Sequence, residues 1–248
     1  AGLWLGYASY NAMRRAYPQQ MPAVSADLQI PLGQIGAPNS MFAATYGFAK
    51  LLGSVASDHV PCPEFHAFGL VLCGLNVAAL GLCSGLNSIA LLWGVQGLLQ
   101  AFGWPLLARI IVSELPPQDR GKYWGMLSMA GNVGQLLTPY GMVLATEIGL
   151  SWRSAFVAAG CFALVMAMAV WLLLCYGQPC RSYSSGNDKD VNSKPGLGTS
   201  MLFTSLSSVI RDPALLALML SNLLGYFVHR STAEWGVVYL KEIGLASS

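Results

Sequence analysis

Three long stretches of this chain contain no aspartate, glutamate, lysine or arginine. They cover residues 65–108, 123–146 and 154–180. A helix that crosses a bilayer needs about 20 mainly apolar residues, whereas a helix at the surface of a soluble domain keeps one polar face. Charged residues make up only 10% of the whole chain, against about a quarter in soluble domains. We therefore predict an all-α membrane protein that crosses the bilayer several times.

Seven apolar segments are predicted to be transmembrane helices. Their approximate limits are 1–26, 36–57, 65–83, 88–112, 122–146, 152–176 and 213–239. The stretch between the sixth and seventh segments is rich in serine, glycine and charged residues, a composition typical of a mobile linker. Residues 1–177 are thus expected to form an N-terminal six-helix bundle, residues 178–212 a cytoplasmic linker between bundles, and residues 213–248 the first helix of a truncated second bundle.

The basic residues of the predicted loops indicate how the chain is oriented. Those that follow even-numbered helices are Arg120, Lys122, Arg181, Lys189, Lys194 and Arg211. The other loops contain only Arg153, so the positive-inside rule places the even-numbered loops in the cytoplasm. Because no second bundle follows, we expect the chain to be a fragment, and its apolar N-terminus does not look like a removable signal peptide. A seven-helix receptor is the alternative, but receptors usually place the N-terminus outside.

Arg14 is the most informative polar residue, because it lies about midway along the first predicted helix, beside Arg15. Inserting an arginine into the membrane at this depth costs roughly 2.5–3.5 kcal/mol of free energy on measured insertion scales. Arg14 therefore needs a partner or a water-filled cavity. Tyr7, Tyr10 and Arg14 share one helical face. A guanidinium donates bidentately to phosphate, and tyrosine hydroxyls can add hydrogen bonds. This face therefore predicts a phosphate site. The alternative is a structural ion pair, for which the first six helices offer no mid-span acid.

Other basic residues could join Arg14. Lys50 lies within the second predicted helix, although its long side chain could also extend to the membrane surface. His229 and Arg230, in the seventh helix, could face Arg14 across two bundles and hold a dianion from both sides. Arg230 could instead pair with Glu234, four residues further on.

Two more helices carry residues suited to gating or to contact with a sugar. In the fourth, Gly103 and Pro105 flank Trp104 and permit a kink and close helix approach, so a gating hinge is expected there. In the fifth, Asn132 and Gly134 could serve either helix packing or sugar binding.

Patterns typical of enzymes or metal sites do not occur. The sequence has no phosphate-binding glycine loop, no G-x-S-x-G and no carboxylate pair within one helix. His59 and His66 lie near a predicted loop, and the six cysteines lack C-x-x-C spacing and are expected to be small buried side chains. A net charge of +2 without a basic block does not suggest nucleic acid. We expect no enzyme activity, no cofactor and no metal.

An ordered set of motifs resembles a known family. The motifs are Gly6-Tyr7-x-x-Tyr10-x-x-x-Arg14-Arg15 with Met21-Pro22, Tyr46 to Lys50 with Asp58, Gln100 to Pro105, Asn132 with Gly134, Ser151-Trp152-Arg153, and Glu234-Trp235-Gly236. Together they resemble the organophosphate/phosphate antiporter branch of the major facilitator superfamily, and within it the glucose-6-phosphate translocases of the endoplasmic reticulum. The segment from Gln100 to Pro105, similar to Q-G-x-G-W-P, is the most specific match.

This resemblance implies a major facilitator fold and a multi-pass protein of the endoplasmic reticulum membrane. The implied function is exchange of glucose 6-phosphate for inorganic phosphate by alternating access, with functional coupling to a phosphatase. It further implies a phosphate-binding arginine at Arg14, a lysine at Lys50, a basic residue at His229 and a cytoplasmic aspartate at Asp58. Gly131 stands where glycerol phosphate transporters have a histidine, which argues against that substrate.

Three alternatives remain open at this point. The first is transport of another sugar phosphate or of glycerol phosphate. The second is a phosphate-sensing membrane receptor that binds its ligand without moving it, and the third is a truncated pseudo-transporter.

Overall fold

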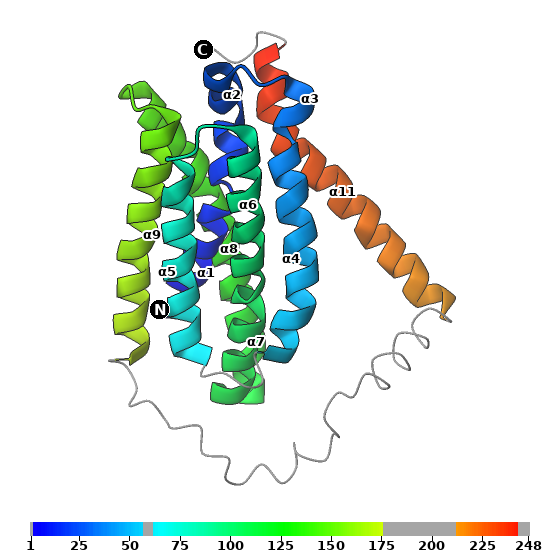
Figure 1. The fold of residues 1–248 in the computed structure, drawn as a ribbon. Helices are drawn as coiled ribbons and strands as arrows, with labels where there is room; N and C mark the ends of the chain where they lie inside the picture. The colour runs from blue at the N-terminus through cyan, green and yellow to red at the C-terminus, as the bar shows by residue number, and fades with distance from the viewer. Residues whose placement is uncertain (1, 57–61, 176–211, 243–248) are drawn as a thin grey trace. The chain divides into compact units, whose positions relative to one another are not determined.

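The computed structural model describes residues 2–56, 62–175 and 212–242, and within these ranges the chain forms helices and no strand. The helices are α1 (Gly2–Met13), α2 (Ala16–Leu28), α3 (Leu32–Ile35), α4 (Ala37–Ala56), α5 (Cys62–Leu80), α6 (Leu86–Ala101), α7 (Gly103–Glu114), α8 (Pro117–Glu147), α9 (Trp152–Cys175) and α11 (Pro213–Glu242) (Figure 1). The prediction of an all-α protein is confirmed. The chain divides into two compact units, Ala1–Cys180 and Arg181–Ser248; α11 belongs to the second.

The first predicted transmembrane helix is two helices in the structure. α1 ends at Met13, α2 begins at Ala16, and Arg14 and Arg15 form the turn between them. Pro18 explains the break, because proline has no amide hydrogen and its ring crowds the carbonyl group four residues earlier, which is that of Arg14. The expectation of one continuous helix over 1–26 is therefore wrong at this point, and both arginines lie at the discontinuity.

A second break separates α6 from α7. Phe102 stands between Ala101, the last residue of α6, and Gly103, the first of α7. Pro105 crowds the carbonyl group of Ala101 in the same way. The kink thus lies where Gly103 and Pro105 predict one.

Two helical stretches among the described residues are long and apolar enough to cross a membrane by length and composition alone. They are Leu86–Ser113, which includes the kink, and Trp152–Leu174; Glu64–Leu80 is a shorter apolar helix. The other described segments predicted to cross the membrane contain charged or polar side chains, of which Arg14 and Lys50 are examples. Intramembrane charges of this kind usually face a bundle interior or a water-filled cavity.

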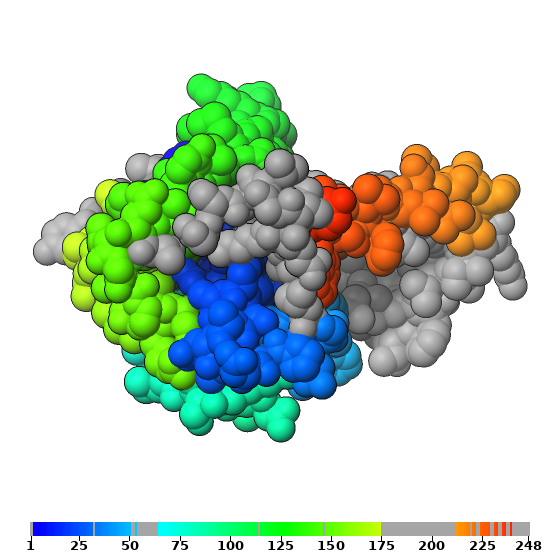
Figure 2. All heavy atoms as spheres, turned by 90° about the horizontal axis from the view of Figure 1, so that it is seen from above, coloured from blue at the N-terminus to red at the C-terminus, as the bar shows by residue number. Residues whose placement is uncertain are grey.

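Within the first unit, helices pack in close pairs: α4 with α6, α5 with α9, and α1 with α8 (Figure 1). Small residues permit the close approach, as is common between membrane helices. A Cβ atom on Gly134 of α8 would lie 2.8 Å from the carbonyl carbon of Ala8 on α1, and one on Gly160 of α9 would lie 2.6 Å from the carbonyl oxygen of Gly74 on α5. Figure 2 shows the N-terminal segment in blue between the green helices α8 and α9 and the light-blue α4.

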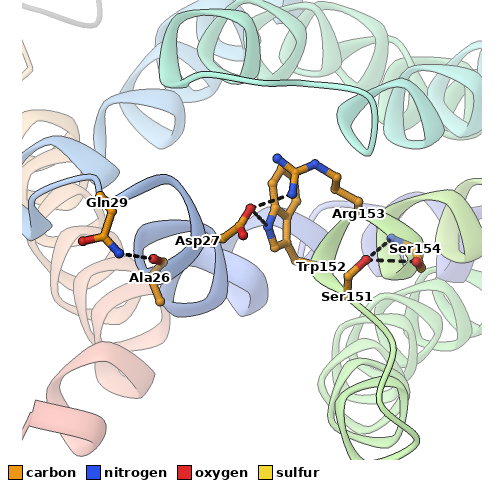
Figure 3. Close-up of polar contacts among 7 residues, drawn as sticks. All are labelled: Ala26, Asp27, Gln29, Ser151, Trp152, Arg153 and Ser154. Carbon is orange, nitrogen blue, oxygen red and sulfur yellow. Dashed lines mark hydrogen bonds and ion pairs between the residues drawn. The ribbon is translucent and has the colours of Figure 1, made fainter.

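A polar cluster joins the end of α2 to the start of α9 (Figure 3). Asp27 Oδ2 accepts hydrogen bonds from Arg153 Nη1 at 2.6 Å and from Trp152 Nε1 at 3.0 Å. The guanidinium carbon of Arg153 also lies 4.1 Å from the centre of the Trp152 ring. These hydrogen bonds, that from Arg153 foremost, hold the pKa of the Asp27 carboxyl below its usual value. The cluster therefore links α2 to α9 through Asp27 and Trp152, which lie 125 residues apart in the sequence.

Candidate functional site

Arg14 lies at the break between α1 and α2, where two neighbouring helices contact its guanidinium. Its Nε donates a hydrogen bond to Oε1 of Gln100, on α6, at 2.9 Å. Its central carbon lies 4.6 Å from the centre of the Tyr46 ring, on α4, which is within cation–π range. Arg14 is only partly buried. These contacts hold the side chain in place without neutralising its charge.

Lys50 contacts the same aromatic ring as Arg14. Its Nζ lies 5.5 Å from the centre of the Tyr46 ring, one helical turn earlier on α4, and the side chain is exposed. Among the residues that the structure describes, no carboxylate lies within ion-pair distance of Arg14 or Lys50. Two cations that contact one ring repel each other, and an anion bound nearby would relieve that repulsion.

Gln100 is a site residue that the sequence prediction missed. Its side chain is 2% exposed, and while Oε1 accepts from Arg14, Nε2 has no hydrogen-bond partner among the described residues. One turn earlier, Gln96 accepts a hydrogen bond from Asn76 Nδ2 at 2.8 Å. Gln100 begins the most specific motif in the sequence, which was the available signal, but its partner could not be found from spacing along one helix.

Arg15 has a different environment from Arg14. It is 8% exposed, and its Nε and Nη2 donate to Oε1 of Gln135, on α8, at 3.2 and 3.0 Å. Gln135 Nε2 in turn lies 3.5 Å from Asn11 Oδ1. Arg15 therefore connects the helix break to α8.

Tyr7 and Tyr10, predicted to orient a phosphate with Arg14, have separate partners. Tyr10 is 2% exposed, and its hydroxyl donates to the backbone carbonyl of His66 at 3.1 Å. The Tyr7 ring is partly buried and lies 5.2 Å from that of Trp104. The Tyr10 hydroxyl is thus already engaged with α5, while that of Tyr7 has no hydrogen bond in the described part of the chain.

His66 lies in the first turns of α5, and its side chain is in the interior of the bundle. Its ring is fully buried on α5, with its centre 5.0 Å from that of Tyr10. Neither ring nitrogen has a hydrogen-bond partner within the described ranges.

The comparison with known families decides the class of protein. Residues 3–248, nearly the whole chain, match the family described as the Major Facilitator Superfamily. The chain belongs to this superfamily. It is accordingly a multi-pass integral membrane protein, as predicted from its charge-free stretches.

Several curated proteins of the superfamily are similar to this chain. It is 28% identical over 250 residues to the membrane sensor protein UhpC of Salmonella typhimurium, which covers 97% of this chain and 55% of that protein. It is 31% identical over 164 residues to a probable hexose phosphate transport protein of Chlamydia trachomatis, 66% of this chain and 36% of that protein. A glycerol-3-phosphate transporter of Haemophilus influenzae is 24% identical over 267 residues, 98% of this chain and 55% of that protein. The chain spans about half the length of these full-length matches.

A solved structure of the superfamily has the same fold. A bacterial homologue of the human lysosomal transporter Spinster, in an inward-facing and unoccupied conformation, superposes with a TM-score of 0.79. The match covers 99% of this chain and 55% of that one at 19% identity. The predicted major facilitator fold is confirmed.

Of the remaining predicted site residues, some lie on described helices and others lie outside the described part of the chain. Asn132 is exposed on α8, while Trp104 and Pro105 are partly buried in the first turn of α7. Asp58 lies outside the described residues, and so do the side chains of His229, Arg230 and Glu234. The described part of the chain holds no group of three or more His, Cys, Asp or Glu side chains that could bind a metal.

Proposed function

We propose that the protein carrying this chain transports a phosphorylated small solute across a membrane in exchange for inorganic phosphate. The observation that carries the proposal is the pair of cations Arg14 and Lys50, which lie against the single ring of Tyr46 with no described carboxylate partner. In a membrane domain such charges are costly unless an anion or water compensates them.

The geometry around Arg14 suits a phosphoryl group. Because Gln100 occupies the Nε atom, the two terminal nitrogens remain available for the bidentate contact that guanidinium groups make with phosphate. Lys50 would add a second, more mobile charge. The site also lies where a transmembrane helix is broken, which is where many transporters place their substrate. The contribution of His229 or Arg230 stays a prediction from the sequence.

We further propose a hexose phosphate, with glucose 6-phosphate as the first candidate, as the organic substrate. Support comes from the motif resemblance and from the similarity to hexose phosphate transport proteins. Location in the endoplasmic reticulum and coupling to a phosphatase rest on the motif resemblance alone, since the three curated relatives named above are bacterial, and both stay predictions.

Counterflow of labelled phosphate in liposomes tests the proposal. The full-length protein should exchange internal for external phosphate, and glucose 6-phosphate should compete. Arg14→Ala should abolish exchange, and Lys50→Ala should weaken it strongly. Lys122→Ala is the matched control, because Lys122 is also exposed but lies at the start of α8, away from the site. Abundant exchange by Arg14→Ala would refute the phosphate assignment.

A sensor is the second candidate, because the relative named UhpC is a membrane sensor protein that matches 97% of this chain. A sensor would bind glucose 6-phosphate saturably through the same two cations but show no trans-stimulated flux. Measuring binding and counterflow on one preparation distinguishes the two functions.

A further inference from the structure

One face of α8 supports the turn at which the first predicted transmembrane helix is broken. Gln135 and Thr138 lie three residues apart on α8, and therefore on one side of it. Thr138 Oγ1 donates a hydrogen bond to the carbonyl oxygen of Ala12, in the last turn of α1, at 2.8 Å. Gln135 Oε1 accepts hydrogen bonds from Nε and Nη2 of Arg15 at 3.2 and 3.0 Å. We call Gln135 and Thr138 the α8 brace, because they bind the chain on both sides of Arg14.

The α8 brace bonds to the break where the backbone has lost part of its regular hydrogen bonding. The last carbonyl groups of a helix have no partner within that helix. The Ala12 carbonyl accepts the amide hydrogen of Arg15 at 3.1 Å, a tight bond of the kind found in a 3₁₀-helix. Thr138 gives the same oxygen a second donor. Its hydroxyl also lies 3.1 Å from the carbonyl of Gly134 in its own helix, so the shorter bond to Ala12 is the one that joins α8 to α1.

Gln135 is itself held at the other end of its amide group. Its Nε2 donates long hydrogen bonds to Asn11 Oδ1 at 3.5 Å and to the carbonyl of Gly131 at 3.4 Å. Asn11 Nδ2 in turn donates to the carbonyl of Tyr7, one turn earlier on α1, at 2.9 Å. Because its oxygen bonds to Arg15 and its nitrogen to α1 and α8, the amide is fixed in one orientation. Gln135 therefore holds Arg15 from a fixed position.

A glycine on α8 brings the α8 brace within reach of the turn. Gly134, next to Gln135, lies so close to α1 that a Cβ atom there would be 2.8 Å from the carbonyl carbon of Ala8. Ala8 and Ala12 are four residues apart and share one side of α1. The short Thr138 side chain can therefore reach the Ala12 carbonyl, because no larger residue separates the two backbones.

The position of the turn decides where the Arg14 guanidinium lies. Gln100 and Tyr46 contact the far end of this side chain from α6 and α4, whereas the α8 brace holds the residues before and after it in the chain. A bidentate contact to phosphate depends on both the place and the plane of the guanidinium. Binding groups of this kind must be held to within about 0.5 Å, which takes a supporting layer of hydrogen bonds. The α8 brace supplies such a layer, and it acts on Arg14 through the backbone.

We propose that Gln135 and Thr138 are positioning residues for the anion bound at Arg14. By fixing the turn between α1 and α2, they aim the two terminal nitrogens of the guanidinium at a phosphoryl group. The inference rests on the proposed function and extends it to α8, whose two polar side chains set the affinity for phosphate through Arg14. A purely structural role would stabilise the bundle and leave that affinity unchanged.

Phosphate self-exchange by the full-length protein in liposomes tests the α8 brace. Thr138→Val keeps the shape of the side chain but removes its donor. This variant should raise the KM for phosphate about tenfold with little change in Vmax, since a misplacement of about 1 Å can cost more than that. Thr138→Ser keeps the hydroxyl and should restore the KM of the unaltered protein. Ser25→Ala is the matched control, because it also removes a 2.8 Å bond from a hydroxyl to a backbone carbonyl, but at the end of α2 away from Arg14.

Phosphate-dependent melting of the purified protein measures the same effect without flux, because a ligand that binds the folded state raises its melting temperature. Thr138→Val should need about tenfold more phosphate than Ser25→Ala for an equal rise. Equal phosphate requirements, or a lower Vmax with an unchanged KM, would overturn the positioning role and leave the proposed function standing. Absence of both exchange and phosphate-dependent melting in the unaltered protein would instead refute the proposed function, and the positioning role with it.

Discussion

Replacing Gly134 by alanine should force α8 away from α1. A Cβ atom at this position would lie 2.8 Å from the carbonyl carbon and 3.0 Å from the Cα of Ala8, and closer still to the carbonyl oxygen of Ala8. These are backbone atoms, so no side-chain rotation can relieve the contact. Since carbon atoms pack best at about 3.5–4.0 Å, the helices must separate by roughly 1 Å.

The cost of that separation has two parts. Overpacking of a close contact costs about 1–3 kcal/mol. The shift also stretches two hydrogen bonds that join α1 and the turn after it to α8: Thr138 Oγ1 to the carbonyl of Ala12 at 2.8 Å, and Arg15 to Gln135 at 3.0 Å. Each is worth about 0.5–1.5 kcal/mol, and more where a charge is involved. The expected loss of unfolding free energy is therefore about 2–4 kcal/mol.

Thermal unfolding of the purified full-length protein in detergent measures the effect. The matched control is Gly141→Ala on the same helix, where a Cβ atom would meet nothing within 4 Å. Because alanine is a better helix former than glycine by about 1 kcal/mol, this control should melt at the same temperature as the unaltered protein or slightly higher. Equal melting of the Gly134 and Gly141 variants would refute the close contact between α1 and α8.

Three further predictions concern the site and its supports. Gln100→Glu places a carboxylate 2.9 Å from Arg14 Nε; it should compete with phosphate and raise the KM for phosphate exchange more than tenfold, by roughly 1.4 kcal/mol or more. Tyr10→Phe should lower the unfolding free energy by about 1 kcal/mol but change phosphate KM little, since its hydroxyl is bonded to backbone; a large KM change would show that it contacts phosphate. Asp27→Asn should lower the melting temperature at neutral pH. Because the hydrogen bond from Arg153 lowers the pKa of Asp27, its stabilising effect should vanish as the pH falls through that lowered pKa, so both proteins should melt alike in acid.

The sequence alone determined the class of fold and most helix limits. Long charge-free stretches predict membrane helices because the bilayer core requires nearly all residues of a transmembrane helix to be apolar. Pro105 and Gly103 also predicted the kink between α6 and α7, since proline acts on the backbone four residues away in the same helix. Pro18 carried the same information for the break at Arg14, which the apolar pattern of the first segment obscured.

Only the tertiary structure decided which polar side chains meet. Gln100 lies 86 residues from Arg14, and Gln135 lies 120 residues from Arg15. Such pairs depend on how far each helix is rotated and shifted against its neighbour, and these quantities follow from packing at small residues such as Gly134, not from any local pattern. For the same reason Tyr10, on the predicted face with Arg14, has its hydroxyl turned to α5: a shared helical face tells which residues point the same way, but the neighbouring helices decide what they contact.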